Sequence, residues 1–301
     1  MALLREQPPG AEAVTSGLIV AQGFVPDSPA SVSWSASPGL SWDENINGGI
    51  AAEALRLNGL TLRTDADSRA KVGVVPSLSL GLIAEKTYAP GAVVKAFALT
   101  TAGYSPDYRI GKADLTFGLC SAHSLDADWF ADLCVTQTRR LRQLGNSTER
   151  AYSIGFEKLF AAGHSLHSLT IRPQIEQLDA RTRPMIGLDW MALYPDLGIL
   201  SLSLLAGETP DGYAGATRFA SFGAKRDLFG ALTGLTASVE TSAGQRYFGV
   251  QRVDETYSLS VTRKIGDWGE AQLGYRLRQS SIAGFDDTSV QFGFRFTGWN
   301  G

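Results

Sequence analysis

Long uninterrupted apolar segments are missing from this 301-residue chain. The longest apolar stretches, such as Gly198 to Ala206, fall far short of the roughly 20 residues that a membrane-spanning helix needs. Met1 to Gly17 also lacks the charged, apolar and small-residue layout of an export signal. The sequence therefore argues against a helical membrane protein, and export would require a signal upstream of this chain.

An excess of positive charge is missing as well. The 27 lysines and arginines are outnumbered by 30 aspartates and glutamates, which gives a net charge of -3. The nearest approach to a basic run is Arg139, Arg140 and Arg142. Without a basic patch the chain has no general attraction for nucleic acid, and we expect no nucleic-acid partner.

Histidine is scarce, and this limits the enzymatic chemistry available. The three histidines, His123, His164 and His167, all lie at or near predicted short turns. A hydrolase needs a nucleophile beside a base, and the nearness of Ser165 to His164 and His167 in the sequence does not establish such a pair. We expect no enzyme, and no metal or other cofactor.

Cysteine is equally scarce, with only Cys120 and Cys134. They flank a turn-like stretch from Leu125 to Asp128, so they face each other if that turn joins two antiparallel strands. Both fall on the polar face of their strands. A disulfide in an oxidising compartment and two free thiols both remain possible.

What the chain does have is strict alternation, most clearly in the segment from Thr288 to Phe296. Val290, Phe292, Phe294 and Phe296 fall on one face, and Ser289, Gln291, Gly293 and Arg295 fall on the other. Such a strand fits a soluble sandwich with an apolar core or a membrane barrel with an apolar exterior.

The alternation recurs along the chain and predicts fourteen strands. They are Ser31 to Trp42, Val72 to Lys86, 92–104, 109–121, 130–141, 150–160, 166–177, 183–193, 198–207, 216–226, 231–241, 255–264, 269–279 and 287–297.

The connections between these strands alternate in length. Short turns rich in Gly, Pro and Asp lie on one side, at 88–92, 124–128, 161–164, 194–198, 227–230 and 265–269. Mostly longer and more polar connections lie on the other, at 43–70, 105–108, 141–149, 177–182, 207–215, 241–254 and 280–286. Outer-membrane barrels have this asymmetry, with both termini on the periplasmic side.

Residues 29–301 are therefore predicted to form an all-β, 14-stranded antiparallel transmembrane β-barrel of the bacterial outer membrane. Residues 1–28 are interpreted as a leader or the remnant of an upstream periplasmic region. A soluble β-sandwich or solenoid is the alternative.

Strand parity divides the side chains between membrane lipid and lumen. The predicted lipid face includes Leu115, Phe117, Leu119, Tyr152, Ile154, Phe156, Leu169, Ile171, Leu200, Leu202, Leu204, Tyr257, Leu259, Val261, Leu273, Tyr275 and Leu277, with Trp34, Trp42, Trp129, Trp190, Trp268 and Trp299 as interfacial anchors. The predicted lumen lining includes Lys112, Asp114, Asp132, Glu157, Arg172, Gln174, Glu176, Asp189, Gln272, Arg276, Arg278, Gln291 and Arg295. Asp132 and Glu157 are interpreted as counter-ions for Lys112 or Arg172.

The segment SPGLSWDENIN, from Ser37 to Asn47, resembles the start of the barrel in the surface lipoprotein assembly modifier family. The matching residues are Trp42, Asp43, Asn45, Ile46 and Asn47, and a looser similarity covers residues 29–298. The resemblance implies an outer-membrane barrel that helps a client lipoprotein reach the cell surface. These 301 residues leave no room for the family's periplasmic helical repeats, so either that domain was cut away or this is a reduced, barrel-only relative.

The aromatic C-terminal strand resembles the signal that the outer-membrane assembly machinery reads, although Thr297 to Gly301 extend beyond its last aromatic residue. In the first strand, Pro38 lacks a ladder donor and Gly39 lacks a side chain. The first and last strands must pair to close the barrel, and we call this contact the seam. Pro38 and Gly39 would weaken the seam, where the first strand faces the strand that carries Phe292, Phe294 and Phe296.

Three functions follow as hypotheses. The first is a translocation barrel of the lipoprotein-modifier type, in which that seam or the polar lumen passes a polypeptide. The second is a diffusion porin for small polar solutes selected by Arg172, Arg276, Arg278 and Arg295, and the third is a polysaccharide exporter. The Asp/Asn cluster at 43–47 is interpreted as turn chemistry rather than a cation site.

Overall fold

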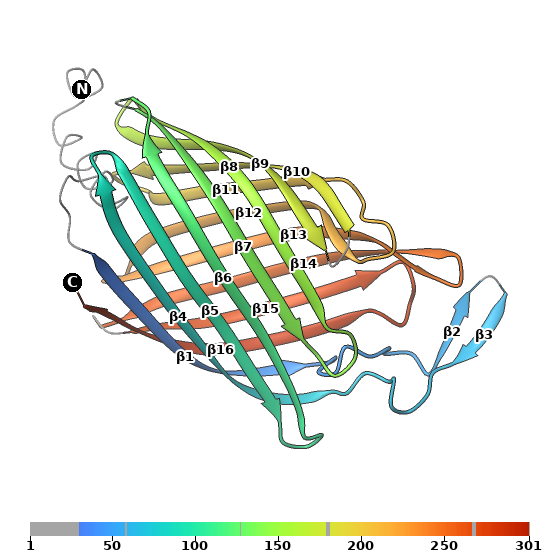
Figure 1. Cartoon of the computed structure of the whole chain (residues 1–301). Coiled ribbons are helices and arrows are strands. Elements are labelled where there is room, and N and C mark those ends of the chain that lie inside the picture. Colours follow the sequence, from blue (N-terminus) through green and yellow to red (C-terminus); the bar gives the residue numbers. More distant parts are fainter. Residues whose placement is uncertain (1–29, 58, 127, 179–180, 267–268, 301) are drawn as a thin grey trace.

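The described part of the chain contains a closed barrel. The computed structural model describes residues 30–57, 59–126, 128–178, 181–266 and 269–300, and residues 1–28, interpreted above as a leader, lie outside that range. Fourteen antiparallel strands follow each other around the barrel, and β1 (Ser31–Asp43) pairs with both β4 (Gly73–Ala89) and β16 (Asp287–Asn300) (Figure 1). The predicted fold class is confirmed.

The remaining barrel strands lie close to their predicted positions. They are β5 (Ala92–Ser105), β6 (Ile110–Ser124), β7 (Trp129–Leu141), β8 (Ser147–Ala162), β9 (Ser165–Leu178), β10 (Arg181–Tyr194), β11 (Gly198–Gly207), β12 (Gly215–Leu228), β13 (Ala231–Tyr247), β14 (Val250–Ile265) and β15 (Gly269–Ser280). Among the described residues no helix has the length and apolar character to cross a membrane.

The two faces of the wall differ in chemistry, as parity predicts. Outward apolar side chains remain about half exposed, for example Leu119 at 56 % and Phe292 at 56 %. Inward positions carry serines, threonines, glycines and ion pairs. Large apolar side chains exposed in this number require an apolar surrounding, and a closed sheet satisfies its own backbone hydrogen bonds there.

The two ends of the barrel differ in their connections. The beginning of β1 and the end of β16 lie together at the end that carries the short turns (Figure 1). The opposite end carries the connections 44–72, 142–146, 208–214 and 281–286, and we call it the loop end.

The prediction of a long loop from Thr241 to Asp254 is wrong. β13 and β14 continue through it as a paired hairpin whose turn is Phe248 and Gly249. Both turn residues have positive φ, 48° and 82°, as a two-residue hairpin of the type I′ class requires. Phenylalanine is an unusual first residue for such a turn, which explains why the sequence did not reveal it.

The connection from 44 to 72 is also more ordered than predicted. It contains a hairpin of β2 (Ala54–Leu57) and β3 (Leu60–Arg63), which projects beyond the loop end (Figure 1). Leu55 and Leu57 form a small apolar core with Ile282 and Phe285 of the connection between β15 and β16. The hairpin is thus packed on a neighbouring loop.

The seam between β1 and β16 is paired on both sides of Pro38. Ala36 lies opposite Phe296 and Gly39 opposite Gly293, while no pairing is assigned at Ser37 and Pro38. A Cβ on Gly39 would lie 3.3 Å from the carbonyl oxygen of Phe292, so the glycine permits a close approach of the strands. The interruption covers Ser37 and Pro38, and the weakening of the seam by Gly39 stays a prediction.

Cys120 and Cys134 are direct cross-strand partners on β6 and β7 and are joined by a disulfide. Of the predicted interfacial tryptophans, Trp34, Trp42 and Trp129 are more than 40 % exposed on the outer face. Trp268 and the side chain of Trp299 lie outside the described residues.

Barrel closure can be tested by cross-linking Ser41 to Gln291, which are opposite each other across the seam and both face inward. In a background with Cys120→Ser and Cys134→Ser, we expect Ser41→Cys with Gln291→Cys to form a disulfide on oxidation. The cyclised product should show altered mobility on a denaturing, non-reducing gel. The control pair, Ser41→Cys with Val290→Cys, places the thiols on opposite faces. Equal cross-linking of both pairs, or none of either, would contradict the register.

Candidate functional site

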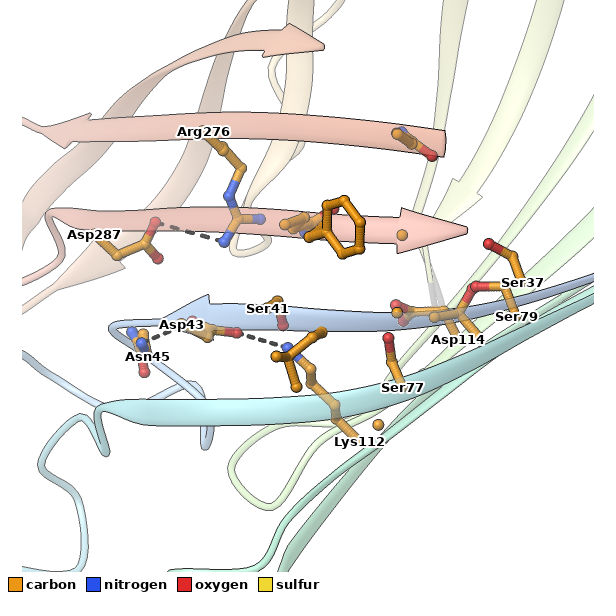
Figure 2. A pocket seen from close by; sticks show the side chains of 18 of the residues that line it. Ser37, Ser41, Asp43, Asn45, Ser77, Ser79, Lys112, Asp114, Arg276 and Asp287 are labelled. Carbon is orange, nitrogen blue, oxygen red and sulfur yellow. Dashed lines mark hydrogen bonds and ion pairs between the residues drawn. The ribbon is translucent and has the colours of Figure 1, made fainter. Parts of the chain in front are cut away.

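The inner wall at the loop end surrounds a polar cavity of about 580 Å³. Its lining comes from strands on both sides of the seam, with Ser37, Ser41 and Asp43 from β1, Ser77 and Ser79 from β4, and Arg276 and Asp287 from β15 and β16 (Figure 2). We call it cavity I. Hydroxyl groups and charges give it the lining of a water-filled space.

Ion pairs dominate this level of the lumen, and all of them lie where strands meet the loop end. Nζ of Lys112 lies 2.6 Å from a carboxylate oxygen of Asp43 (Figure 2). The other pairs are Arg142 with Asp114 at 2.8 Å, Arg140 with Glu149 at 2.8 Å, Arg183 with Glu176, Arg252 with Asp254, and Arg276 and Arg278 with Asp287. We call this set the mouth cluster.

Asp287 is the most heavily shared carboxylate of the mouth cluster. Its side chain is only 3 % exposed and contacts Arg278 directly, while a terminal nitrogen of Arg276 lies 3.6 Å away. One carboxylate is therefore shared by two guanidinium groups and balances the charge of only one of them. The side chain of Arg276 is 43 % exposed, so positive charge remains accessible to water.

A second polar cavity, of about 590 Å³, adjoins the first and shares Arg276 and Arg278 with it. We call it cavity II. Five basic and three acidic side chains line cavity I, and three basic and two acidic side chains line cavity II. Both linings thus carry a small excess of positive charge.

A separate charged level lies deeper in the barrel. Arg172 lies 3.1 Å from Asp132 and 3.6 Å from Asp189, and thereby connects β7, β9 and β10. Lys95 pairs with Glu85 at 2.9 Å, and Glu157 lines the same small cavity. Here carboxylates outnumber basic side chains. Asp132 pairs with Arg172, whereas Lys112 pairs with Asp43 and not with Asp132 or Glu157.

The predicted lumen residues all occupy inward positions. Cavity I is lined by Lys112, Asp114, Gln272, Arg276, Arg278 and Gln291, and the small cavity deeper in the barrel is lined by Asp132, Glu157 and Arg172. The other four residues have inward partners: Gln174 contacts Met185, Glu176 pairs with Arg183, Asp189 pairs with Arg172, and Arg295 pairs with Glu270.

Sequence reasoning missed several members of the mouth cluster. Arg252 and Asp254 belong to the segment predicted as a loop, so no face was assigned to them. Arg140, Arg183 and Asp287 alternate correctly with outward residues, and strict parity could have found them.

The segment that carries the family resemblance organises the loop above cavity I. Asp43 accepts a hydrogen bond from the backbone N–H of Asn45 at 2.8 Å, which is an Asx turn. Asn47 is fully buried, donates to the carbonyl of Arg69 at 2.8 Å and accepts from the N–H of Lys71 at 3.0 Å. Its own carbonyl accepts from Leu144, which attaches the loop between β7 and β8. These contacts are turn and loop chemistry.

Ser165 and His167 lie at hydrogen-bond distance, with 2.8 Å between the hydroxyl and Nε2. A serine hydrolase would need an acid on the other ring nitrogen. Nδ1 instead accepts a hydrogen bond from the indole N–H of Trp190 at 3.2 Å, and the hydroxyl donates to the carbonyl of Ala162. This arrangement belongs to an aromatic cluster with Phe160 at the turn end, and it lacks the orientation of a triad.

Comparison with known proteins adds one fold-level finding. No family model matches the chain, and no curated protein matches it. Among solved structures, OprB of Pseudomonas putida is similar with a TM-score of 0.50 and 6 % identity, over 97 % of each chain. OccK1 (OpdK) of Pseudomonas aeruginosa has a TM-score of 0.49 and 10 % identity, over 90 % of this chain and 99 % of that one. At this identity the likeness to OprB shows the fold alone.

Asn47→Ala should loosen the loop from 48 to 71. The substitution leaves the carbonyl of Arg69 and the N–H of Lys71 without their partner, at a cost of about 1–3 kcal/mol for each buried group. We expect trypsin to cut near Arg69 and Lys71 roughly 30-fold faster or more. The two losses together cost at least about 2 kcal/mol, and each 1.4 kcal/mol raises the population of the open loop about tenfold.

The matched control is Asn45→Ala, which removes a single side-chain hydrogen bond to the carbonyl of Gly49 and should have a smaller effect. Heat-modifiable gel mobility monitors the barrel in each variant. Cleavage of the Asn47→Ala protein at the wild-type rate would contradict the anchoring role.

Proposed function

We propose that this barrel is a passive diffusion channel that lets small polar solutes cross the bacterial outer membrane. The observation that carries the proposal is a closed barrel with an apolar exterior and two adjoining polar cavities inside. A barrel of fourteen strands is too wide for side chains alone to fill, so water occupies the remainder. Water and paired charges are a suitable lining for hydrated solutes.

The charged levels would control which solutes pass. Cavities I and II have a small positive excess, and their arginines already have carboxylate partners. Paired charges retain a local field but do not hold an ion permanently. We therefore propose a modest preference for anions at the mouth.

The barrel would be oriented with its loop end outside the cell and both termini in the periplasm. The support is the position of the chain ends at the end with short turns, which is the usual arrangement in bacterial barrels. The aromatic side chains of β16 would serve as the contact for the assembly machinery during insertion.

The resemblance to surface lipoprotein assembly modifiers remains a prediction. Passage of a polypeptide through the seam would require β1 and β16 to separate, and they are paired on both sides of Pro38. The small-solute channel is therefore the better supported proposal.

Purified protein in planar bilayers should give a steady current. Arg276→Gln should reduce the anion-to-cation permeability ratio about sevenfold. A unit charge roughly 7 Å from an ion in water contributes about 0.6 kcal/mol, which lowers anion permeability about threefold and raises cation permeability about threefold. Asp287→Asn should raise the ratio, since it removes the carboxylate shared by Arg276 and Arg278.

The control is Tyr275→Phe, which alters the outward neighbour of Arg276 and should leave the ratio unchanged. The absence of any current, or a permeability ratio that none of these charges affects, would overturn the channel proposal. Assay of surface lipoprotein display in a strain lacking the protein separates the channel from the translocation hypothesis.

A further inference from the structure

The outer face of the barrel carries a broad apolar groove of about 640 Å³ that extends from β5 to β10. Its outward lining includes Leu133, Val135, Tyr152, Ile154 and Ile175. Pro173 and Pro184 form part of the groove, and the pairing of β8 with β9 is interrupted between Gln174 and Ile171. The groove crosses six strands, so it is about 24 Å wide at roughly 4.8 Å per strand.

A polar row lies directly above this groove on the side of the loop end. One row of paired outward residues in the groove consists of Val135, Tyr152, Ile175 and Pro184, on β7, β8, β9 and β10 in that order. On each of these strands the next outward residue towards the loop end is polar, and these residues are Gln137, Arg150, Gln177 and Thr182. Arg139, two residues beyond Gln137, lies diagonally from Arg150. Both arginines are exposed.

The positive charge of this row is not balanced on the outer face. The outward positions of β7 to β10 contain no aspartate or glutamate. Nε of Arg150 donates to the side-chain oxygen of Gln137 at 2.9 Å, and no carboxylate among the described residues pairs with Arg139 or Arg150. The arginines of the mouth cluster, in contrast, each have a carboxylate partner.

The height of the row matches the boundary of a membrane. A second row of paired outward residues lies at the other end of the same strands and consists of Trp129, Lys158, Leu169 and Trp190. The ammonium group of Lys158 lies over the ring of Trp129. Eight residues separate Trp129 from Gln137, which at about 3.4 Å each and a tilt of about 40° is roughly 20 Å of height. An apolar band of roughly this height is typical of outer-membrane barrels, so Arg139 and Arg150 lie at headgroup depth.

We propose that this surface binds a lipid with several acyl chains and a phosphorylated headgroup, specifically lipid A of the outer leaflet. The chains lie in the groove, and Arg139 and Arg150 bind the phosphate, with Gln137 and Gln177 as additional donors. Guanidinium groups bind phosphate oxygens through paired, charge-assisted hydrogen bonds. The width of the groove fits a lipid with more than two chains.

Native mass spectrometry of the full chain in detergent, titrated with diphosphoryl lipid A, tests the proposal. The wild-type barrel should retain this lipid, and R139Q/R150Q should bind it about 25-fold more weakly. Each lost arginine charge should weaken the affinity about fivefold, and the two factors multiply. R139K/R150K should retain much of the affinity. The matched control is R218Q, an exposed arginine at the loop end of β12 that does not line the groove, and its binding should equal that of the wild type.

Two further lipids separate the headgroup from the chains. Dephosphorylated lipid A should bind R139Q/R150Q and the wild type equally weakly, and phosphatidylglycerol should bind the wild type more weakly than diphosphoryl lipid A. Equal binding of diphosphoryl lipid A by the wild type and R139Q/R150Q, with heat-modifiable mobility confirming both folds, would overturn the proposal. So would equal affinity for phosphatidylglycerol, or a dimer that excludes lipid from the groove.

Discussion

The whole structure depends on hydrogen bonding across the seam between β1 and β16. A sheet surrounded by hydrocarbon chains has no water to satisfy the donors and acceptors of an edge strand, so the first and last strands must pair. The ten assigned pairs from Val32 with Asn300 to Asp43 with Ser289 meet this requirement, with an interruption at Pro38. The glycine pair, Gly39 and Gly293, lets the two backbones approach closely there.

Closure also determines where charges meet. Lys112 and Asp43 are 69 residues apart in sequence and belong to β6 and β1, yet they form an ion pair because the wall curves around a common space. The mouth cluster arises in the same way, since every second side chain near the loop end must point inward. Partly buried charges need partners, and the nearest available partners lie on neighbouring strands.

Much of the fold was predictable from the sequence because a strand has a period of two. Parity assigned Phe292 to the outside and Gln291 to the lumen without any knowledge of the structure. It failed where alternation carries no information about pairing. The hairpin of β2 and β3 depends on Leu55 and Leu57 packing against Ile282 and Phe285, a contact between distant loops. The extension of β13 and β14 depends on a turn with positive φ at Phe248, for which the sequence has no usual signal.

The candidate site was predictable in composition but not in its partners. Arg172 was assigned to the lumen, but its simultaneous contact with Asp132 and Asp189 follows from the register of three strands. That register places an acidic excess deep in the barrel and a basic excess at the mouth. An ion that crosses the lumen would therefore meet fields of opposite sign in sequence, each partly cancelled by internal pairing. Such an arrangement disfavours strong selection by charge alone, so the size of the solute and its hydrogen bonds to the inward serines and threonines would contribute comparably.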